Sequence, residues 1–240
     1  MGEYSYDLHI HSCLSPCGDD DSTPANIAAL ADLLGLDIVA LTDHNTCKNC
    51  PAFFEAARNY SFLPIAGMEL TTEEEIHVVC LFPTLESALV FDEFVHEKIM
   101  PIPNKPEIFG NQLIMNSEDE VCGIEEICLI NATSIDLYSL TGLVKQYGGI
   151  CFPAHIDRSS FSLLSSLGFI PEDLGIETVE IRYKEAVDNL KNQHPYLQNC
   201  KIVHDSDAHT LENISLPENF LTLEEKTVTA VLKALCSTFE

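Results

Sequence analysis

The apolar run YSYDLH at residues 4–9 is followed, after a polar loop, by the helix-like segment PANIAALADLL at residues 24–34 and by a second apolar run, DIVAL, at residues 37–41. Pro24 suits the first turn of a helix, and Gly35 suits its end. The alternation of strand-length and helix-period segments continues along most of the 240 residues. Repeated βα units of this kind favour an α/β fold over a β-sandwich or a helical bundle.

The remaining predicted elements extend this pattern to about seven strand–helix repeats. We expect further strands at residues 63–66, 76–82, 149–153, 178–181 and 201–203, and further helices at residues 51–58, 136–147, 160–167, 185–192 and 224–235. Residues 83–132 break the rhythm, because a helix-like beginning gives way to Pro101, Pro103 and Pro106 and then to a polar stretch. We predict an insertion or small subdomain there, carried on a βα scaffold that spans residues 1–240.

The composition limits the partners that the protein can have. Asp and Glu number 38 and Lys and Arg number 12, so the formal net charge is −26. A surface this acidic repels phosphate backbones and anionic bilayers, and we therefore expect no stable nucleic-acid complex and no membrane attachment. The sequence shows neither a membrane span nor a signal peptide at its start, so we expect a cytoplasmic protein whose 10 cysteines are reduced. The oligomeric state stays open.

Metal-ligand side chains collect at the ends of the predicted strands. His9 and His11 lie two residues apart at the end of the first strand, so their side chains project to the same face. The later strands begin or end with Asp43 and His44, Glu69, His77, His155, and the group His204, Asp205, Asp207 and His209. In a βα barrel the carboxyl ends of the strands converge on one face, which predicts a metal site there. Nitrogen and oxygen ligands favour zinc, manganese or iron, and their number exceeds the needs of one tetrahedral ion.

Five motifs in this order resemble those of the PHP superfamily, which is named for polymerase and histidinol phosphatase. They are HIHS at residues 9–12, TDHN at 42–45, GMEL at 67–70, AHIDR at 154–158 and DAH at 207–209. The resemblance covers residues 6–209 and implies a metal-dependent phosphoesterase on a distorted seven-stranded βα barrel. The insertion looks like that of the branch that contains small nucleotide phosphoesterases and an RNA exonuclease.

The resemblance also implies two or three divalent ions and their ligands. The first ion would be held by His9, His11, Glu69 and Asp207, the second by His44 and His155, and the third by Glu69, His77 and His209. Relatives usually follow the first motif with Ser-Asp-Gly, whose Asp completes the second ion, whereas this chain has the longer loop SPCGDDD at residues 15–21. Asp19 is the predicted equivalent, with Asp20 and Asp21 as alternatives. Asp43 is expected to orient a ligand or to move a proton.

The charges indicate a mechanism. Three divalent ions set against Asp19, Glu69 and Asp207 would leave the cavity at about +3, so an anionic phosphate can enter an otherwise acidic protein. A hydroxide that bridges two ions would attack the phosphorus atom. Arg158 is the first candidate for binding the phosphate and Lys48 is the second. We therefore predict a hydrolase of a small phosphate monoester or nucleotide, with an exonuclease on short oligonucleotides as the alternative.

Two cysteine pairs follow the first two predicted strands and should lie on loops at the metal face. They are Cys13 with Cys17, and Cys47 with Cys50. Four thiolates could hold zinc or an iron–sulfur cluster, or the pairs could respond to oxidants, which would make the chain a metal or redox sensor without catalytic activity. Unliganded thiols are the simplest interpretation.

Overall fold

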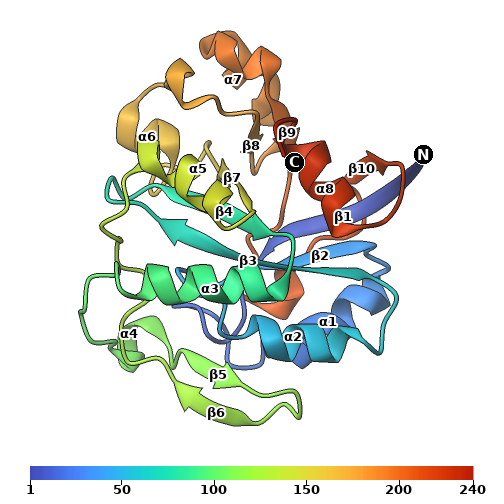
Figure 1. The fold of residues 1–240 in the computed structure, drawn as a ribbon, viewed down its shortest axis with the longest axis vertical. Coiled ribbons are helices and arrows are strands. Elements are labelled where there is room, and N and C mark those ends of the chain that lie inside the picture. Colours follow the sequence, from blue (N-terminus) through green and yellow to red (C-terminus); the bar gives the residue numbers. More distant parts are fainter. Residues whose placement is uncertain (240) are drawn as a thin grey trace.

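The computed structural model describes residues 1–239 and has a curled central sheet covered by helices (Figure 1). Six strands form this sheet in the order β10-β1-β2-β3-β4-β7. Their bounds are Gly2–Ile10 for β1, Ile38–Leu41 for β2, Leu63–Thr71 for β3, His77–Phe82 for β4, Ile150–Pro153 for β7 and Phe220–Leu223 for β10. Strands β1, β2 and β3 are parallel, as successive βα units require.

A second, two-stranded sheet continues the curl. Strands β8 (Thr178–Glu180) and β9 (Lys201–Val203) are parallel to each other, and β8 lies beside β7. The chain after β9 returns to β1, where Ala208 forms a bridge with Ile10. The α/β fold is therefore curled like a barrel, but its hydrogen bonds give a sheet of six strands and a sheet of two, not a closed ring of the predicted seven.

Strand β4 runs antiparallel to both β3 and β7, unlike the strands of a regular βα barrel. The connection from β3 is only a turn, closed by a hydrogen bond from the Thr72 N–H to the Ile76 carbonyl at 2.9 Å. This turn is too short for the crossover that a parallel pair needs. Strand β4 therefore begins where β3 ends, so that His77 and Glu69 lie at the same end of the two strands.

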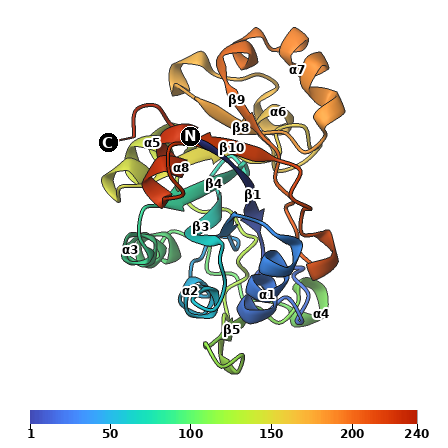
Figure 2. The same cartoon turned by 90° about the vertical axis from the view of Figure 1, so that its right-hand side faces the viewer.

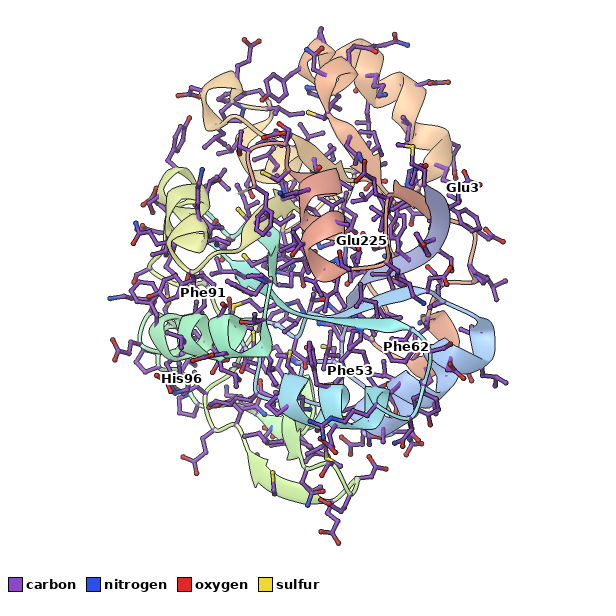
Figure 3. All side chains as sticks on the ribbon, turned by 45° about the vertical axis from the view of Figure 1, so that its right-hand side comes forward. Glu3, Phe53, Phe62, Phe91, His96 and Glu225 are labelled. Carbon is purple, nitrogen blue, oxygen red and sulfur yellow. The ribbon has the colours of Figure 1, made fainter. Side chains whose placement is uncertain are left out.

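Three helices form a layer on one face of the sheet (Figure 1). They are α1 (Pro24–Leu34), α2 (Cys50–Ala57) and α3 (Leu85–His96). As the sequence predicts, α1 has Pro24 in its first turn and ends at Gly35, whose φ of 81° is the left-handed conformation that glycine favours. Figure 3 shows Phe53 and Phe91 between these helices and the sheet, where both are fully buried. Burial of such side chains stabilises the fold by about 1.5–3 kcal/mol each.

Other helices close the inside and the far end of the curl. Helix α8 (Val228–Leu235) packs Val231 and Leu232 against Leu8 and Ala40 inside the sheet, and α5 (Leu137–Gln146) packs beside β7. Helices α6 (Leu163–Leu167) and α7 (Val187–Gln193) lie with β8 and β9 at the end opposite to β5 (Figure 2). Short 3₁₀-helices span Glu172–Leu174, Lys184–Ala186, Pro195–Asn199 and Leu211–Asn213. Within residues 1–239, no helix combines the length and the apolar character that crossing a membrane would need.

The predicted insertion has two parts. Helix α3 packs on β3 and β4 as part of the helical layer, whereas α4 (Pro106–Phe109), β5 (Leu113–Met115) and β6 (Val121–Ile124) project from the barrel (Figure 1). This projecting part is bonded to the loop after β2. The Asn45 amide donates to the Leu129 carbonyl at 2.7 Å, and the Met115 N–H donates to Asn49 Oδ1 at 2.9 Å. The insertion therefore supports the loop that carries His44.

Candidate metal centre

A bulge in β1 turns two histidines toward the mouth of the barrel. The pairing of β1 with β2 shifts register between Asp7 and Ile10. Before the shift, Tyr6 packs inside the curl, and after it Ile10 packs in the outer hydrophobic core. The extra residue in the bulge changes which face the side chains take, so His9 and His11 both point into the mouth. Both are almost fully buried.

Glu69 lies at the centre of the histidines. Its Oε1 atom is 2.9 Å from His77 Nδ1, 2.9 Å from His155 Nε2 and 3.3 Å from His9 Nε2. Its Oε2 atom is 2.9 Å from His44 Nδ1 and 3.4 Å from His11 Nε2. The side chain of Glu69 is 0% exposed. One carboxylate therefore touches imidazoles from four strands or strand ends.

Four side chains at the mouth have the spacing of ligands in a tetrahedral metal site. The Nε2 atom of His9 is 3.1 Å from His11 Nε2 and 3.6 Å from Asp207 Oδ1, and His11 Nε2 is 3.4 Å from the same Asp207 atom. In a tetrahedral site with bonds of about 2.0–2.1 Å, neighbouring ligand atoms are about 3.3–3.4 Å apart. His9, His11, Glu69 and Asp207 thus form one group that can hold an ion.

Two further groups share members with the first. They are His44 with Glu69 and His77, and His11 with His44 and His209. The sequence predicts a different partition, in which His44 pairs with His155 and His77 with His209. The reason for the difference is that His44 presents both ring nitrogens, with Nδ1 facing Glu69 and Nε2 lying 3.4 Å from His209 Nε2. His155 faces only Glu69 among these ligands.

Several ligand atoms are buried without a hydrogen bond. Within residues 1–239, His44 Nδ1, Glu69 Oε2 and Asp207 Oδ1 have no hydrogen-bond partner. The first two are 2.9 Å apart but are not aligned as donor and acceptor. A buried polar atom left unpaired costs about 1–3 kcal/mol, and cations held by these ligand groups would satisfy all three atoms.

Asp43 acts on His11 through a serine. The carboxylate of Asp43 accepts hydrogen bonds from the Ser12 N–H, the Ser12 hydroxyl and the Ser15 hydroxyl, each at 2.7 Å. Because the Ser15 hydroxyl donates to Asp43, its oxygen accepts from His11 Nδ1 at 2.8 Å. His11 therefore keeps a proton on Nδ1, and Nε2 is the nitrogen that faces the metal site. Burial raises the pKa of Asp43 above its usual value.

Electrostatics divides the ligands into two kinds. Burial alone would raise the pKa of Glu69, but His77, His9 and His44 hold it well below its usual range, so this side chain is a carboxylate. Burial lowers the pKa of His44 well below 6.5 and that of His209 to about 4, so both rings are neutral at neutral pH. Burial also opposes the charge on His9, yet Glu180, Glu69 and Asp207 raise its pKa well above 6.5. A metal ion at His9 must therefore displace a proton.

The structure does not bring every predicted residue into these groups. Arg158 Nη1 lies 2.6 Å from Asp207 Oδ2, and its side chain is 37% exposed. Lys48 is paired with Glu125 of the insertion. Asp19 is exposed and its Oδ1 accepts from the Asp21 N–H, although the Asp19 N–H donates to the His209 carbonyl at 2.9 Å. Asp19 thus borders the site but stays outside the three ligand groups of residues 1–239.

Sequence reasoning missed two side chains beside the centre. Glu180 at the end of β8 lies 2.7 Å from His9 Nδ1, and the same rule that selected other strand-end residues would have found it. Phe161 stacks on His77 with ring centroids 4.9 Å apart. The φ of Phe161 is 53°, which is strained for a bulky residue, and no sequence pattern marks it. Asp207 also has a positive φ, 52°, which aspartate adopts more readily than a bulky residue does.

The four loop cysteines do not come together as a cluster. Cys13, Cys47 and Cys50 are buried, whereas Cys17 is exposed. Cys47 and Cys50 belong to the hydrophobic core, and burial raises the pKa of the Cys47 thiol well above its usual value. The ligand groups found in residues 1–239 contain imidazoles and carboxylates without a thiol.

Comparisons with known proteins agree with this fold. The family model described as the PHP domain matches residues 7–235. A chain of the lesion-specific endonuclease PfuEndoQ from Pyrococcus furiosus superposes with a TM-score of 0.69 and 18% identity, over 99% of this chain and 56% of that one. A chain from Bifidobacterium adolescentis, described as a candidate metal-dependent phosphoesterase, superposes with a TM-score of 0.59 and 18% identity, over 96% of this chain and 95% of that one.

A protein of Methanocaldococcus jannaschii that is itself uncharacterized is 32% identical over 102 residues, which are 39% of this chain and 59% of that protein. The chain therefore spans less than two thirds of both the endonuclease and this archaeal relative. At 18% identity, the structural likenesses establish the fold alone.

Proposed function

The chain belongs to the PHP domain family, and from this premise we propose that it hydrolyses phosphate esters with two or three divalent metal ions. The unpaired, buried atoms of His44, Glu69 and Asp207 carry the proposal. They are ligand-type atoms, and they belong to groups whose spacing fits metal coordination. The nitrogen and oxygen donors suit zinc, manganese or iron.

When bound, the ions would activate water and neutralise charge on the phosphate. The protein side chains have separate tasks. Asp43, through Ser15, holds the proton of His11 on Nδ1. Arg158 uses one nitrogen to hold Asp207, and because its side chain is partly exposed, the other N–H groups of its fork can bind a phosphate oxygen. Lys48 is a weaker candidate for this task, because Glu125 already neutralises it.

The preferred substrate is a small phosphate monoester or a nucleotide. The acidic loop residues Asp19, Asp20 and Asp21 are exposed, and Asp19 is bonded to the backbone of His209 at the site. A long polyanion would meet these charges in addition to the net charge of −26. An exonuclease on short oligonucleotides is the second candidate, since it would use the same metal centre. We also propose that the protein forms no stable nucleic-acid complex.

A redox or metal sensor built on the cysteines receives less support. The reactive form of a cysteine is the thiolate, and burial disfavours this form at Cys13, whose pKa it raises to about 12. Cys17, the partner of Cys13 in sequence, is exposed on the loop surface instead. The cysteines are therefore best explained as unliganded thiols.

The proposal is tested by hydrolysis of p-nitrophenyl phosphate and of mononucleotides after the protein is stripped with a chelator and reloaded with Mn²⁺. We expect activity that depends on the metal, that is lost in His155→Gln and that is kept in His194→Gln, a matched change at the end of α7. Tight Mn²⁺ binding without hydrolysis of any phosphate ester would overturn the proposal. Product sizes from end-labelled oligonucleotides would separate the monoesterase from the exonuclease.

A further inference from the structure

We infer that Glu180 is a positioning residue that aims His9 at the metal ions, an inference that rests on the metal centre of the proposed function. Glu180 Oε2 is 2.7 Å from His9 Nδ1, and both side chains are 0% exposed. This contact is shorter than the contacts of His9 with its neighbours at the mouth, which range from 3.1 to 3.6 Å. The bond to Glu180 is thus the strongest fixed contact of the ring.

The fold holds Glu180 rigidly between two ligand-bearing strands. Glu180 is the last residue of β8 and pairs with Val203 of β9. Its carbonyl accepts a hydrogen bond from the Ile156 N–H at 2.9 Å, directly after His155. The His9 ring in turn stacks over the His155 ring, with centroids 5.9 Å apart. The backbone and the side chain of Glu180 therefore fix two neighbouring histidines together.

The bond selects one form of the imidazole. A carboxylate accepts but cannot donate, so His9 presents an N–H at Nδ1, and its Nε2 atom, which faces His11, Glu69 and Asp207, is the nitrogen that gives up its proton to a metal. A neutral ring without this partner can carry its proton on Nε2, where the proton occupies the position that a metal ion needs. Glu180 itself is outside the ligand groups found in residues 1–239. Its effect on the metal therefore acts through His9.

The two β1 histidines are held in different ways. His11 Nδ1 is bonded to the hydroxyl of Ser15, which lies on a loop, whereas His9 Nδ1 is bonded to a buried carboxylate on a strand. A charge-assisted bond is stronger than a bond between neutral groups. We therefore expect the removal of Glu180 to weaken metal binding through His9 more than the removal of the Ser15 hydroxyl would weaken it through His11.

The experiment is a calorimetric titration of the metal-free protein with Mn²⁺, without substrate. Glu180→Ala should weaken binding by about 10–100-fold, the usual effect of removing the partner of a metal-binding histidine. Glu180→Gln should lose less, because its amide oxygen can still accept from Nδ1. Glu177→Gln, which removes the same charge three residues earlier where Glu177 bonds the Ser237 N–H, should bind as the wild type does.

A second measurement reports on the bond itself. In the zinc-loaded, ¹⁵N-labelled protein, one imidazole N–H signal that exchanges slowly with water should persist in Glu180→Gln and disappear in Glu180→Ala. Unchanged Mn²⁺ affinity in Glu180→Ala, or equal losses in the Ala and Gln variants, would overturn the inference. If the Ala variant does not fold, Glu180→Asp replaces it, because its shorter side chain cannot reach His9. A wild-type protein that binds Mn²⁺ but hydrolyses no phosphate ester would overturn the proposed function alone.

Discussion

The strand ends and the loop at residues 15–21 both bring carboxylates to the mouth of the barrel, but in different surroundings. The side chains of Glu69 and Asp207 are 0% and 3% exposed and face several histidines. Asp19, by contrast, is exposed and its side chain accepts a hydrogen bond from its own loop. Asp19 approaches the site through its backbone, since its N–H donates to the His209 carbonyl.

This difference shows that position, and not residue type, decides which carboxylate can hold a metal. A buried carboxylate has lost its water and needs cationic partners, which the histidines and a metal ion supply. An exposed carboxylate keeps its water and gains little from a partner. We therefore propose that the strand ends form the metal centre and that the loop acids contribute mainly charge around its entrance.

The sharpest way to break the comparison is to remove one carboxylate from each region. We expect Glu69→Gln to lose bound metal and to lower kcat by at least about 10³-fold. The variant loses several kcal/mol of charge stabilisation in the transition state, and each 1.4 kcal/mol lowers kcat by about a factor of ten. Asp19→Asn should change kcat by less than about threefold, as expected for a solvated charge. Elemental analysis and steady-state kinetics on the two variants measure both effects.

Full metal occupancy with normal turnover in Glu69→Gln would contradict the bridging role of this residue. Loss of metal in Asp19→Asn would show instead that the loop closes on the ions, as the resemblance to the family predicts for Asp19. Asp20→Asn serves as the matched control within the same loop.

The same contrast explains how much of the fold and of the candidate site could be predicted from the sequence. Helix α1 and the first three strands were predictable, because Pro24, Gly35 and alternating apolar runs are local signals. The position of His9, His44 and Glu69 near strand ends was predictable for a similar reason, since each lies at or just after the end of an apolar run. The family matched by the chain confirms the resemblance that those motifs indicate.

Other features depend on contacts that no local pattern encodes. The bulge in β1 arises from its pairing with β2, and the antiparallel pairing of β4 with β7 forms only in the folded sheet. The edge strand β10 was missed altogether, because its register is set by β1. The grouping of the histidines likewise depends on the fold, since the two ring nitrogens of His44 face Glu69 and His209 only in the folded site.

The pH dependence of stability provides a second test of the buried strand-end residues. Burial opposes the positive charge of His9 and His11, but neighbouring carboxylates raise the pKa of both above 6.5. The stabilisation of the fold by these two histidines is therefore complete below pH 6.5 and is lost as the pH rises through the raised values. The pKa of Glu69 and Asp207 lies below 4.5 and 3.8, respectively, despite burial, because histidines surround them, so their stabilisation is lost only as the pH falls through those lowered values. These groups therefore favour the metal-free fold between pH 4.5 and 6.5.

A metal ion replaces the protons of His9 and His11. The increase in Tm on adding Mn²⁺ should therefore grow between pH 6 and pH 8, because fewer protons compete for the same nitrogens. Thermal unfolding followed by circular dichroism, with and without Mn²⁺, measures this difference. The Asp19→Asn variant should follow the wild-type curve, and a metal effect that shrinks with rising pH would contradict the protonation of these histidines.

Arg158 follows β7, and its guanidinium holds the strand-end residue Asp207. We expect Arg158→Ala to lower kcat/KM by about 10–100-fold, because a hydrogen bond to a charged group contributes about 1.5–3 kcal/mol. Arg158→Lys should recover only part of this loss, because lysine lacks the planar fork. Kinetics and metal analysis of both variants separate the two contacts. Loss of metal would show that Arg158 acts only by holding Asp207. A raised KM with full metal occupancy would show that Arg158 also binds the phosphate.

The smallest effect should come from the loop acids acting on long substrates. An oligonucleotide that extends beyond the metal centre must pass the exposed Asp19, Asp20 and Asp21, whereas a mononucleotide contacts mainly the site itself. We therefore expect kcat/KM to fall as oligonucleotide length grows, and moderate salt to relieve this penalty for long substrates, because exposed charges are screened within about 8 Å at physiological ionic strength. Changing all three aspartates to asparagine should raise kcat/KM for oligonucleotides by about two- to fivefold, a gain of less than about 1 kcal/mol. The same variant should leave hydrolysis of a mononucleotide unchanged. Activity that instead rises with length and is lost on adding salt would reveal a basic binding track, and the exonuclease would then replace the monoesterase as the better account of this protein.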